Sequence, residues 1–534
     1  MIYAQFATFY DAYVWLLKAA ISAAVAASVL ISFDRLLRVA KYLKIVAQCW
    51  LNGARPEDAF APRPLPDPKQ ASALYPRVAV QLPMFNERSV CQACIASACE
   101  MAWPRDRFCV QVLDDSTCQH TRQLVDDAAA EWQERGVRVE VVRRTNRAGY
   151  KAGALKDGLD LLAEYDFIAI FDADFKPDSD FLMSTVPYLI DNPEVGYVQA
   201  RWVFANPEES YLTKAQEISL NYHCKCEQFV HFAGGGFFNF NGTAGVWRRR
   251  TIVSVGGWKS RTTVEDMDLS LRTFLHGWKA IYLSDVTCIN ELPASFFAYR
   301  KQQHRWTCGP VQLWRKAAGD IWASNLPTMR KLDLILCYFG LRKFATHWVS
   351  LGFFCMLVPL SIFTPEVSIP LWALVHLPVV VTLTTAIFTP RGWMHSILYV
   401  LFENSMGIVK LGAVLAGMLD LKGAQEWVVT TKLGSSDKRP GTADAPPRDC
   451  RFYAGEMAMS TFVLTAAFYG IFSINRWSFS IFLTLQGLVF FAFALNMVDC
   501  GGLLGGRLGA DKKPANILKT GSPFVPLHKR TFTL

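Results

Sequence analysis

The 534-residue sequence lacks the features that assign a chain to several common protein classes. It has 14 Cys, but only Cys91 with Cys94 and Cys224 with Cys226 are closely spaced, and no second pair follows at zinc-site spacing. We interpret these cysteines as reduced or buried thiols. The net charge is +9, yet the basic residues form neither an arm nor one dominant run. The sequence therefore predicts neither a disulfide framework nor nucleic-acid binding.

Apolar residues are abundant and unevenly distributed. They make up 51% of the chain, and the mean hydropathy of +0.17 is high for a soluble globular protein. The excess lies near the N-terminus and after about residue 333, and the segment between has ordinary polar and apolar mixing. We expect one soluble domain of roughly 250 residues between membrane segments.

The first apolar segment, 13–33, is long enough to span a bilayer. Arg35, Arg38, Lys41 and Lys44 follow it, whereas a cleaved signal peptide carries its positive charge before the apolar run. The pattern predicts an uncleaved anchor, with the chain that follows on the cytosolic side. The basic residues are expected to contact anionic membrane lipid.

Further membrane spans are expected after the soluble domain, near 346–364, 368–388, 457–474 and 477–498. A segment at 396–418 contains Glu403 and Lys410, which lie seven residues apart and so on one helical face. This segment either lines a polar path or lies at the membrane interface, which gives five or six spans in total. The predicted regions are an anchor with its basic flank at 1–50, a Pro-rich connector at 51–76, a catalytic domain at 77–330, transmembrane and interfacial helices at 331–500 and a basic tail at 501–534.

The soluble segment has the pattern of an α/β domain. Strand-like apolar runs at 78–83, 110–116, 137–142 and 166–174 alternate with helical patterns such as 119–134. This alternation predicts a mostly parallel sheet, in which ligands bind at the carboxyl ends of the strands. Acidic residues stand at two of those ends: Asp114 and Asp115 after one run, Asp172 and Asp174 after another.

Asp172-Ala173-Asp174 follows the apolar run FIAIF. Two carboxylates that leave a buried strand repel each other and lose hydration, and a hard divalent cation relieves both problems. Mg²⁺ or Mn²⁺ binds one or two carboxylates together with substrate phosphates, and it neutralises the charge that develops on a diphosphate leaving group. The alternative is a surface turn with two aspartates.

Glu265 and Asp266, in TTVEDMDLSLR, form a second acidic pair. Inverting transfer of a sugar needs a base for the proton of the attacking hydroxyl, and we assign Asp266 as that base with Glu265 beside it. A compatible interpretation is a helix N-terminus capped by Thr262 or Thr263.

Gln302, Arg305 and Trp306 occur at i, i+3 and i+4 and so share one helix face. An indole offers a flat apolar surface for a pyranose ring, and the other two side chains can hold hydroxyls or phosphate oxygens. An amphipathic interfacial helix is the alternative. Gly242 and Thr243, in FNGTAGVWR, would allow the backbone to approach a substrate closely.

Taken in order, LDDS, FDAD, VED and QQHRW resemble the processive polysaccharide synthases of glycosyltransferase family two, over about residues 76–320. The spellings QLPMFNER, NRAGYKAGALK, FNGTAGVWR, LFENSMGIVK and EWVVTTKLG are similar to the cellulose-synthase-like A group, the β-mannan and glucomannan synthases. The sister cellulose-synthase-like C group, which makes the β-1,4-glucan backbone of xyloglucan, is the second resemblance.

The resemblance implies an α/β GT-A domain inserted between an N-terminal transmembrane helix and a C-terminal bundle of transmembrane helices, in the Golgi membrane. It also implies an inverting reaction on a nucleotide sugar. By position, the nucleotide would contact Glu87, Asp114, Asp115, Lys151 and Asp172. Mg²⁺ or Mn²⁺ would lie at Asp172 and Asp174, and the acceptor would lie at Gln302, Arg305, Trp306, Gly242 and Thr243.

The sequence leaves the substrate open. GDP-mannose (with GDP-glucose) and UDP-glucose are both compatible donors, and the expected partners are that donor, the growing polysaccharide and membrane lipid, with a homo-oligomer left open. Two other hypotheses are a membrane transporter or scaffold that has lost catalysis and a transferase that adds one sugar to a polyprenyl phosphate. The intact Asp172, Asp174, Asp266 and Trp306 argue against the first, and the Gln302–Trp306 platform with its apolar helices argues against the second.

Overall fold

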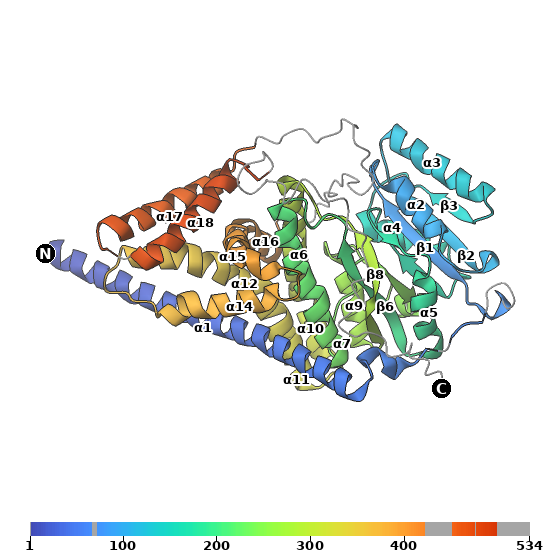
Figure 1. Ribbon diagram of the computed structural model, residues 1–534, viewed down its shortest axis with the longest axis horizontal. Helices are drawn as coiled ribbons and strands as arrows, with labels where there is room; N and C mark the ends of the chain where they lie inside the picture. The colour runs from blue at the N-terminus through green and yellow to red at the C-terminus, as the bar shows by residue number, and fades with distance from the viewer. Residues whose placement is uncertain (1, 63, 67–71, 422–450, 476, 499–534) are drawn as a thin grey trace, which may run out of the picture.

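The computed structural model describes residues 2–62, 64–66, 72–421, 451–475 and 477–498 (Figure 1). Residues 422–450 and 499–500 of the expected 331–500 region lie outside these residues, and the expected tail at 501–534 lies entirely outside them. In Figure 1 a sheet with its helices forms one side of the molecule and apolar helices form the other. Helices α6 (Tyr211–Tyr222) and α10 (Phe296–Ala323) lie between the two parts.

Eight strands form a single sheet in the order β3-β2-β1-β4-β7-β6-β8-β5. The strands are β1 (Val78–Met84), β2 (Phe108–Asp114), β3 (Val139–Val142), β4 (Phe167–Ile170), β5 (Lys176–Pro177), β6 (Val195–Phe204), β7 (Gly245–Arg248) and β8 (Lys279–Asn290). Pairing is parallel from β3 to β4 and between β6 and β8, while β7 is antiparallel to both its neighbours and β5 is antiparallel to β8. The predicted mostly parallel sheet is confirmed.

The expected strands form because their apolar runs are covered on both faces. Every residue of β1, β2 and β4 is buried, as continuous apolar strands in a parallel sheet require. The helices packed around the sheet are α2 (Cys91–Cys99), α3 (Gln119–Glu134), α4 (Tyr150–Asp160), α5 (Phe181–Asp191), α7 (Phe229–Ala233), α8 (Arg249–Ser254) and α9 (Glu265–Leu275). Helix α3 matches the predicted 119–134 and buries Val125, Ala129 and Trp132.

A buried polar contact fixes α4 against the sheet. The side-chain amide of Gln81 on β1 donates to the side-chain carbonyl of Gln111 on β2 over 2.9 Å, and Gln111 donates to the backbone carbonyl of Gly158 over 3.1 Å. A Cβ at Gly158 would lie 2.6 Å from Gln111 Oε1, so the close approach depends on glycine. This contact sets the position of the helix that carries Lys151.

The apolar half contains helices of unequal length. Within the described residues, three are long and apolar enough to cross a membrane: Thr8–Asn52, Thr328–Ile362 and Ala454–Phe472. A fourth candidate is the pair Gly392–Ser405 and Gly407–Leu419, which is bent by 40°. The spans expected at 368–388 and 477–498 are helical but shorter apolar helices, Trp372–Ala386 and Phe479–Ala494. The described chain therefore has three or four candidate spans, not the five or six expected.

Bounds of the remaining helices are α1 (Ile2–Asn52), α11 (Thr328–Leu332), α12 (Thr346–Trp348), α13 (Val358–Ile362), α14 (Leu377–Ala386), α15 (Ser396–Ser405), α16 (Gly407–Leu419), α17 (Ala454–Phe472) and α18 (Trp477–Ala494), with π-helical turns at Asp333–Ala345 and Val349–Leu357. Helix α1 has 51 residues, about 77 Å at 1.5 Å per residue, so it continues well past its apolar segment. In Figure 1 it runs along one edge from the apolar helices to the sheet side.

Buried ion pairs connect α1 to the rest of the chain beyond its apolar part. Arg38 donates to Asp34 over 2.5 Å and to Glu227, next to α7, over 2.6 Å. Arg342 holds the same Asp34 through two nitrogens, at 3.0 and 2.9 Å. The basic residue predicted to meet lipid at position 38 is therefore buried in a contact within the protein, which couples the anchor to the sheet side.

Candidate active site

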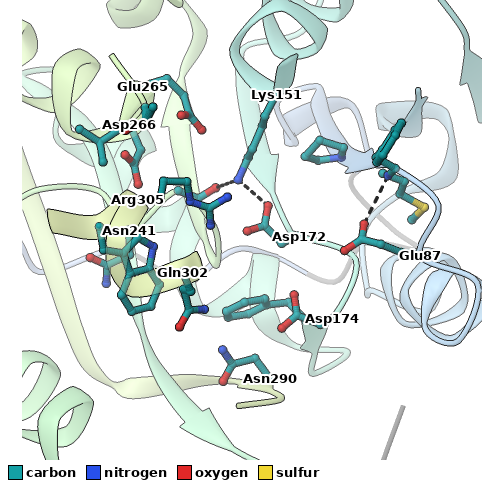
Figure 2. Close-up of a pocket in the computed structure, with 18 of the residues that line it drawn as sticks. Glu87, Lys151, Asp172, Asp174, Asn241, Glu265, Asp266, Asn290, Gln302 and Arg305 are labelled. Atoms are coloured by element: carbon teal, nitrogen blue, oxygen red, sulfur yellow. Dashed lines mark hydrogen bonds and ion pairs between the residues drawn. The ribbon is translucent and has the colours of Figure 1, made fainter. Parts of the chain in front are cut away.

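One cavity at the carboxyl ends of β1, β4 and β8 brings together nearly all the residues predicted for the site (Figure 2). The predicted residues that line it are Glu87, Asp115, Lys151, Asp172, Asp174, Gly242, Glu265, Asp266, Gln302, Arg305 and Trp306. They come from parts of the sequence more than 200 residues apart, so the fold supports the expectation of a single site.

Asp114 and Thr243 lie one residue away from the cavity lining. Asp114 is buried at the end of β2, where its carboxylate accepts from Arg143 Nε over 2.8 Å and from the Ser116 amide over 3.0 Å. Thr243 Oγ1 accepts from the backbone N–H of Asp172 over 2.9 Å. Asp114 thus holds the loop that begins with Asp115, and Thr243 orients the backbone at Asp172.

Lys151 lies in the first turn of α4 and connects two sides of the cavity. Its ammonium donates to the Asp172 carboxylate and, over 2.9 Å, to the backbone carbonyl of Gly242, as Figure 2 shows. Burial lowers the pKa of Lys151, but Asp172, Glu265 and Asp266 outweigh that effect, so the net shift of this pKa is upward. The site therefore keeps a fixed positive charge next to Asp172.

Asp172 and Asp174 follow β4 directly and both line the cavity. Within the part of the chain that the structure describes, no three His, Cys, Asp or Glu side chains converge as a metal cluster would require. Two carboxylates with further oxygens from a diphosphate and water are the coordination that Mg²⁺ and Mn²⁺ use at phosphate-transfer sites. The donor set fits a metal that binds together with the donor substrate.

Glu265 and Asp266 are the first two residues of α9. The N-cap residue is Val264, without a side-chain capping bond, so the interpretation of Thr262 or Thr263 as a cap is wrong. The Met267 amide donates to Asp266 Oδ1 over 2.7 Å. Burial raises the pKa of both carboxyls, and each receives an opposing effect from Lys151. A carboxylate with a raised pKa is suited to accept a proton near neutral pH.

Gln302, Arg305 and Trp306 lie in α10 and line the same cavity as Lys151. Burial lowers the pKa of Arg305, while Glu265, Asp172, Asp266 and Glu87 act to raise it, which places this guanidinium within the field of the acidic site. A Cβ at Gly309 would lie 2.5 Å from Val264, so α10 packs directly on the residue that precedes α9. This one close contact therefore fixes the position of Gln302, Arg305 and Trp306 on α10 relative to Asp266 on α9.

Several lining residues were not predicted from the sequence. Arg147 places its guanidinium 3.4 Å from the centre of the Phe85 ring at the Asp115 end of the cavity. Trp202 lies beside Trp306, with ring centres 6.4 Å apart, and Asn290 ends β8. Trp202 falls within an apolar strand and is indistinguishable there from a core residue. Asn290 is a polar residue at a strand end, the same signal that identified Asp114 and Asp172.

A second cavity, of about 410 Å³, continues from the first into the apolar half. The residues that line both are Trp202, Leu220, Asn241, Val264, Asp266, Gln302 and Trp306. From there it extends to Ser28 and Ser32 on α1 and to Glu403 and Lys410, whose side chains form an ion pair of 2.6 Å. Of the two interpretations of the segment 396–418, the polar path is the one the structure supports.

Sequence comparison relates this site to known enzymes. The family model described as "Glycosyltransferase like family 2" matches residues 76–309. Glucomannan 4-beta-mannosyltransferase 1 of Cyamopsis tetragonoloba is 44% identical over 438 residues, which are 80% of this chain and 83% of the relative. Glucomannan 4-beta-mannosyltransferase 9 of Arabidopsis thaliana is 41% identical over 457 residues, 84% and 85% of the two chains. The chain belongs to glycosyltransferase family 2, in the cellulose-synthase-like A group.

This glycosyltransferase also shares its fold with a solved structure. The mannosyltransferase PcManGT from Pyrobaculum calidifontis, in complex with GDP-Man and Mn²⁺, superimposes with a TM-score of 0.51. The match covers 76% of the glycosyltransferase and 100% of PcManGT at 21% sequence identity. The expected GT-A domain is confirmed as the fold around the site.

Proposed function

We propose that this glycosyltransferase extends a β-1,4-linked mannan or glucomannan from GDP-mannose, with GDP-glucose as a second donor, by inverting transfer. Relatives with 40–44% identity over most of the chain are named glucomannan 4-beta-mannosyltransferases. The observation that carries the proposal is the position of Asp266: a half-buried carboxylate that lines both the donor cavity and the cavity that continues from it.

The donor end of the site is the region of Asp115, Arg147 and Lys151. Arg147 and Lys151 supply positive charge for a diphosphate, and Arg144, which is ion-paired with Asp115, fixes the loop beside them. Mg²⁺ or Mn²⁺ held by Asp172 and Asp174 would neutralise the charge that develops on the departing diphosphate. Gly242 leaves the backbone carbonyl that binds Lys151 open to the cavity.

Transfer requires one proton acceptor and one fixed acceptor hydroxyl. The hydroxyl oxygen attacks the anomeric carbon, the bond from that carbon to the phosphate oxygen breaks, and the proton passes to Asp266. Trp306 supplies a flat surface for the terminal sugar, and Gln302 supplies hydrogen bonds to its hydroxyls. One displacement of this kind inverts the anomeric configuration and produces a β-linkage from an α-linked donor.

The product would leave through the second cavity. That cavity begins at Trp306 and Gln302 and passes between α1, α10 and α15 to Glu403 and Lys410. A path lined by polar side chains within apolar helices suits a hydroxyl-rich chain that crosses a bilayer. We place the enzyme in the Golgi membrane, with the donor cavity on the cytosolic side.

Donor selectivity tests this proposal most simply. Purified full-length protein in detergent is supplied with radiolabelled GDP-mannose, GDP-glucose or UDP-glucose in the presence of Mn²⁺ or Mg²⁺, and products are digested with β-mannanase or β-glucanase. We expect mannanase-sensitive polymer from GDP-mannose and none from UDP-glucose. Polymer from UDP-glucose alone would contradict the proposed substrate, and equal synthesis by Asp266→Asn would contradict the proposed base.

A further inference from the structure

The junction of the two cavities contains side chains to which neither the sequence nor the comparisons assign a role. Trp202 on β6 lines both cavities together with Trp306 and Gln302. Asn290 at the end of β8 lines the first cavity, and in Figure 2 it lies at the same end as Gln302 and Asp174. A sugar unit beyond the terminal one would have to pass this point.

Trp202 is held as a second aromatic wall. Its side chain is 8% exposed, and the ring of Phe175 packs edge-on against it with centres 5.3 Å apart. The rings of Trp202 and Trp306 are inclined by 42° at 6.4 Å, so the two indoles meet at an angle without stacking on each other. Two aromatic surfaces that diverge in this way can each contact one ring of a bent disaccharide.

Asn290 shares the sheet face of Trp202. Phe204 of β6 pairs with Asn290 of β8, and Trp202 is two residues before Phe204, so both side chains project to the same side of the sheet. No hydrogen bond reaches Asn290 Oδ1 within the described residues, although this oxygen is buried. The side-chain carbonyl oxygen of the buried Gln199 amide, by contrast, accepts from the backbone N–H of Asn241 over 2.8 Å.

A buried amide oxygen without a protein partner at a cavity wall is expected to accept from a ligand. A sugar hydroxyl is such a donor. The Trp202 indole N–H likewise has no hydrogen-bond partner among the described residues. In Figure 2 Lys151, the cation paired with Asp172, lies on the far side of Asp172 from Asn290, so a diphosphate held by Lys151 would leave the Asn290 end to the glycan.

We propose that Trp202 and Asn290 form an acceptor subsite for the penultimate sugar of the growing chain, next to the terminal sugar on Trp306. Trp202 contacts the ring, and the Asn290 carboxamide accepts from a ring hydroxyl. The subsite rests on the proposed function, because it needs a glycan of at least two units. It retains the chain between transfers and so determines how many sugars are added before release.

The experiment compares Trp202→Leu with Trp258→Leu. Trp258 is a matched control because it is also buried, its indole N–H is also without a partner in the described chain, and it lines neither cavity. Full-length protein in detergent is given GDP-mannose, and polymer length, mannose incorporated per GDP released and the KM for GDP-mannose are measured. Size-exclusion chromatography and thermal unfolding report folding.

For Trp202→Leu we expect at least about tenfold shorter or scarcer polymer, as for loss of an aromatic anchor, with little change in the KM for GDP-mannose. More GDP is released per mannose incorporated, Trp202→Phe recovers part of the chain length, and Asn290→Leu acts in the same direction. Trp258→Leu keeps the wild-type length distribution.

Mannan of wild-type length from folded Trp202→Leu and Asn290→Leu would overturn the subsite and leave the proposed function intact. An equal loss of length in Trp258→Leu would also overturn it, since the effect would then be one of general destabilisation. Wild-type protein that makes no polymer from GDP-mannose would instead overturn the proposed function, and the subsite with it.

Discussion

Gly242 leaves open the space directly in front of Asp266: a Cβ at Gly242 would lie 2.8 Å from Asp266 Oδ2. The same atom would lie 3.5 Å from Lys151 Nζ. The carboxylate assigned as the base and the cation beside Asp172 therefore both face a backbone without a side chain.

Gly242→Ala is expected to slow polymer synthesis by roughly 100-fold while the protein stays folded. The methyl group displaces Asp266, and a misplacement of about 1 Å can cost roughly 100-fold in rate. Initial rates with GDP-mannose check this. Gly277→Ala is the control, because Gly277 has a φ of +82°, close to the +80° of Gly242, with no atom within 4 Å of a Cβ. If both variants lost activity equally, backbone strain would explain the result and the steric account would be wrong.

Asp266→Asn and Asp268→Asn are expected to change stability in opposite directions. The pKa of Asp266 is raised in the folded protein, so its ionised form opposes folding at neutral pH and its removal raises the Tm. Activity falls by about 100- to 10,000-fold through loss of the base. Asp268 is fully buried in ion pairs with Arg261 and Arg272, so its loss costs roughly 3–5 kcal/mol of unfolding free energy.

Thermal unfolding of the two variants checks this contrast. A lower Tm for Asp266→Asn than for wild type would contradict the claim that burial destabilises the charged Asp266.

As pH is lowered, kcat/KM is expected to fall with a midpoint above about pH 4, which is the ordinary pKa of a carboxyl group. Burial and the negative charge of Asp172 raise the pKa of Asp266, while Lys151 and Arg305 lower it, and the net shift is upward. A raised pKa means that the active carboxylate is lost as pH falls through the higher value. An acid limb at or below pH 4 would contradict the assignment, and the measurement needs only initial rates in constant ionic strength.

Removal of divalent metal is expected to stop transfer, and Mn²⁺ or Mg²⁺ is expected to restore it. Asp174→Asn should raise the metal concentration for half-maximal activity by about tenfold or more, because it removes one of two carboxylates. Asp178→Asn, at an exposed position four residues on, is the control. Full activity in excess chelator, or equal metal curves for the two variants, would count against a metal at this site.

Gly309→Ala is expected to slow transfer without changing the KM for GDP-mannose. Its Cβ would meet Val264 at 2.5 Å and push α10, with Gln302 and Trp306, away from Asp266. Gly319→Ala in the same helix meets no atom within 4 Å and should stabilise the protein by up to about 1 kcal/mol. A rate for Gly309→Ala equal to that of Gly319→Ala would show that the helix contact has no role in aligning the acceptor.

The sequence was most informative at strand ends. Asp172 and Asp174 were identified because a fully buried strand forces its terminal polar residues to one edge of the sheet. Asp114 was placed at that edge correctly, but its carboxylate turns to Arg143, a contact that no local pattern encodes. Trp202 was missed because it lies within an apolar strand, and its proximity to Asn290, a polar residue at a strand end, arises only through the parallel register of β6 and β8.

The membrane half was harder to predict because apolar composition fixes neither where a helix ends nor how it bends. The segment expected at 346–364 is the end of a longer helical run from Thr328, which includes π-helical turns, and the segment 396–418 bends at Met406. Arg38 was expected at the lipid surface from its place after an apolar run. Its actual partner, Glu227, is 189 residues away.

The most direct test of the account uses the purified protein in sealed proteoliposomes, with radiolabelled GDP-mannose and Mn²⁺ added outside. Mannan that β-mannanase digests only after the vesicles are opened with detergent is the predicted result, because it requires transfer at Asp266 and passage along the second cavity. Absence of polymer from GDP-mannose, or polymer that remains fully digestible from outside the sealed vesicles, would contradict the account.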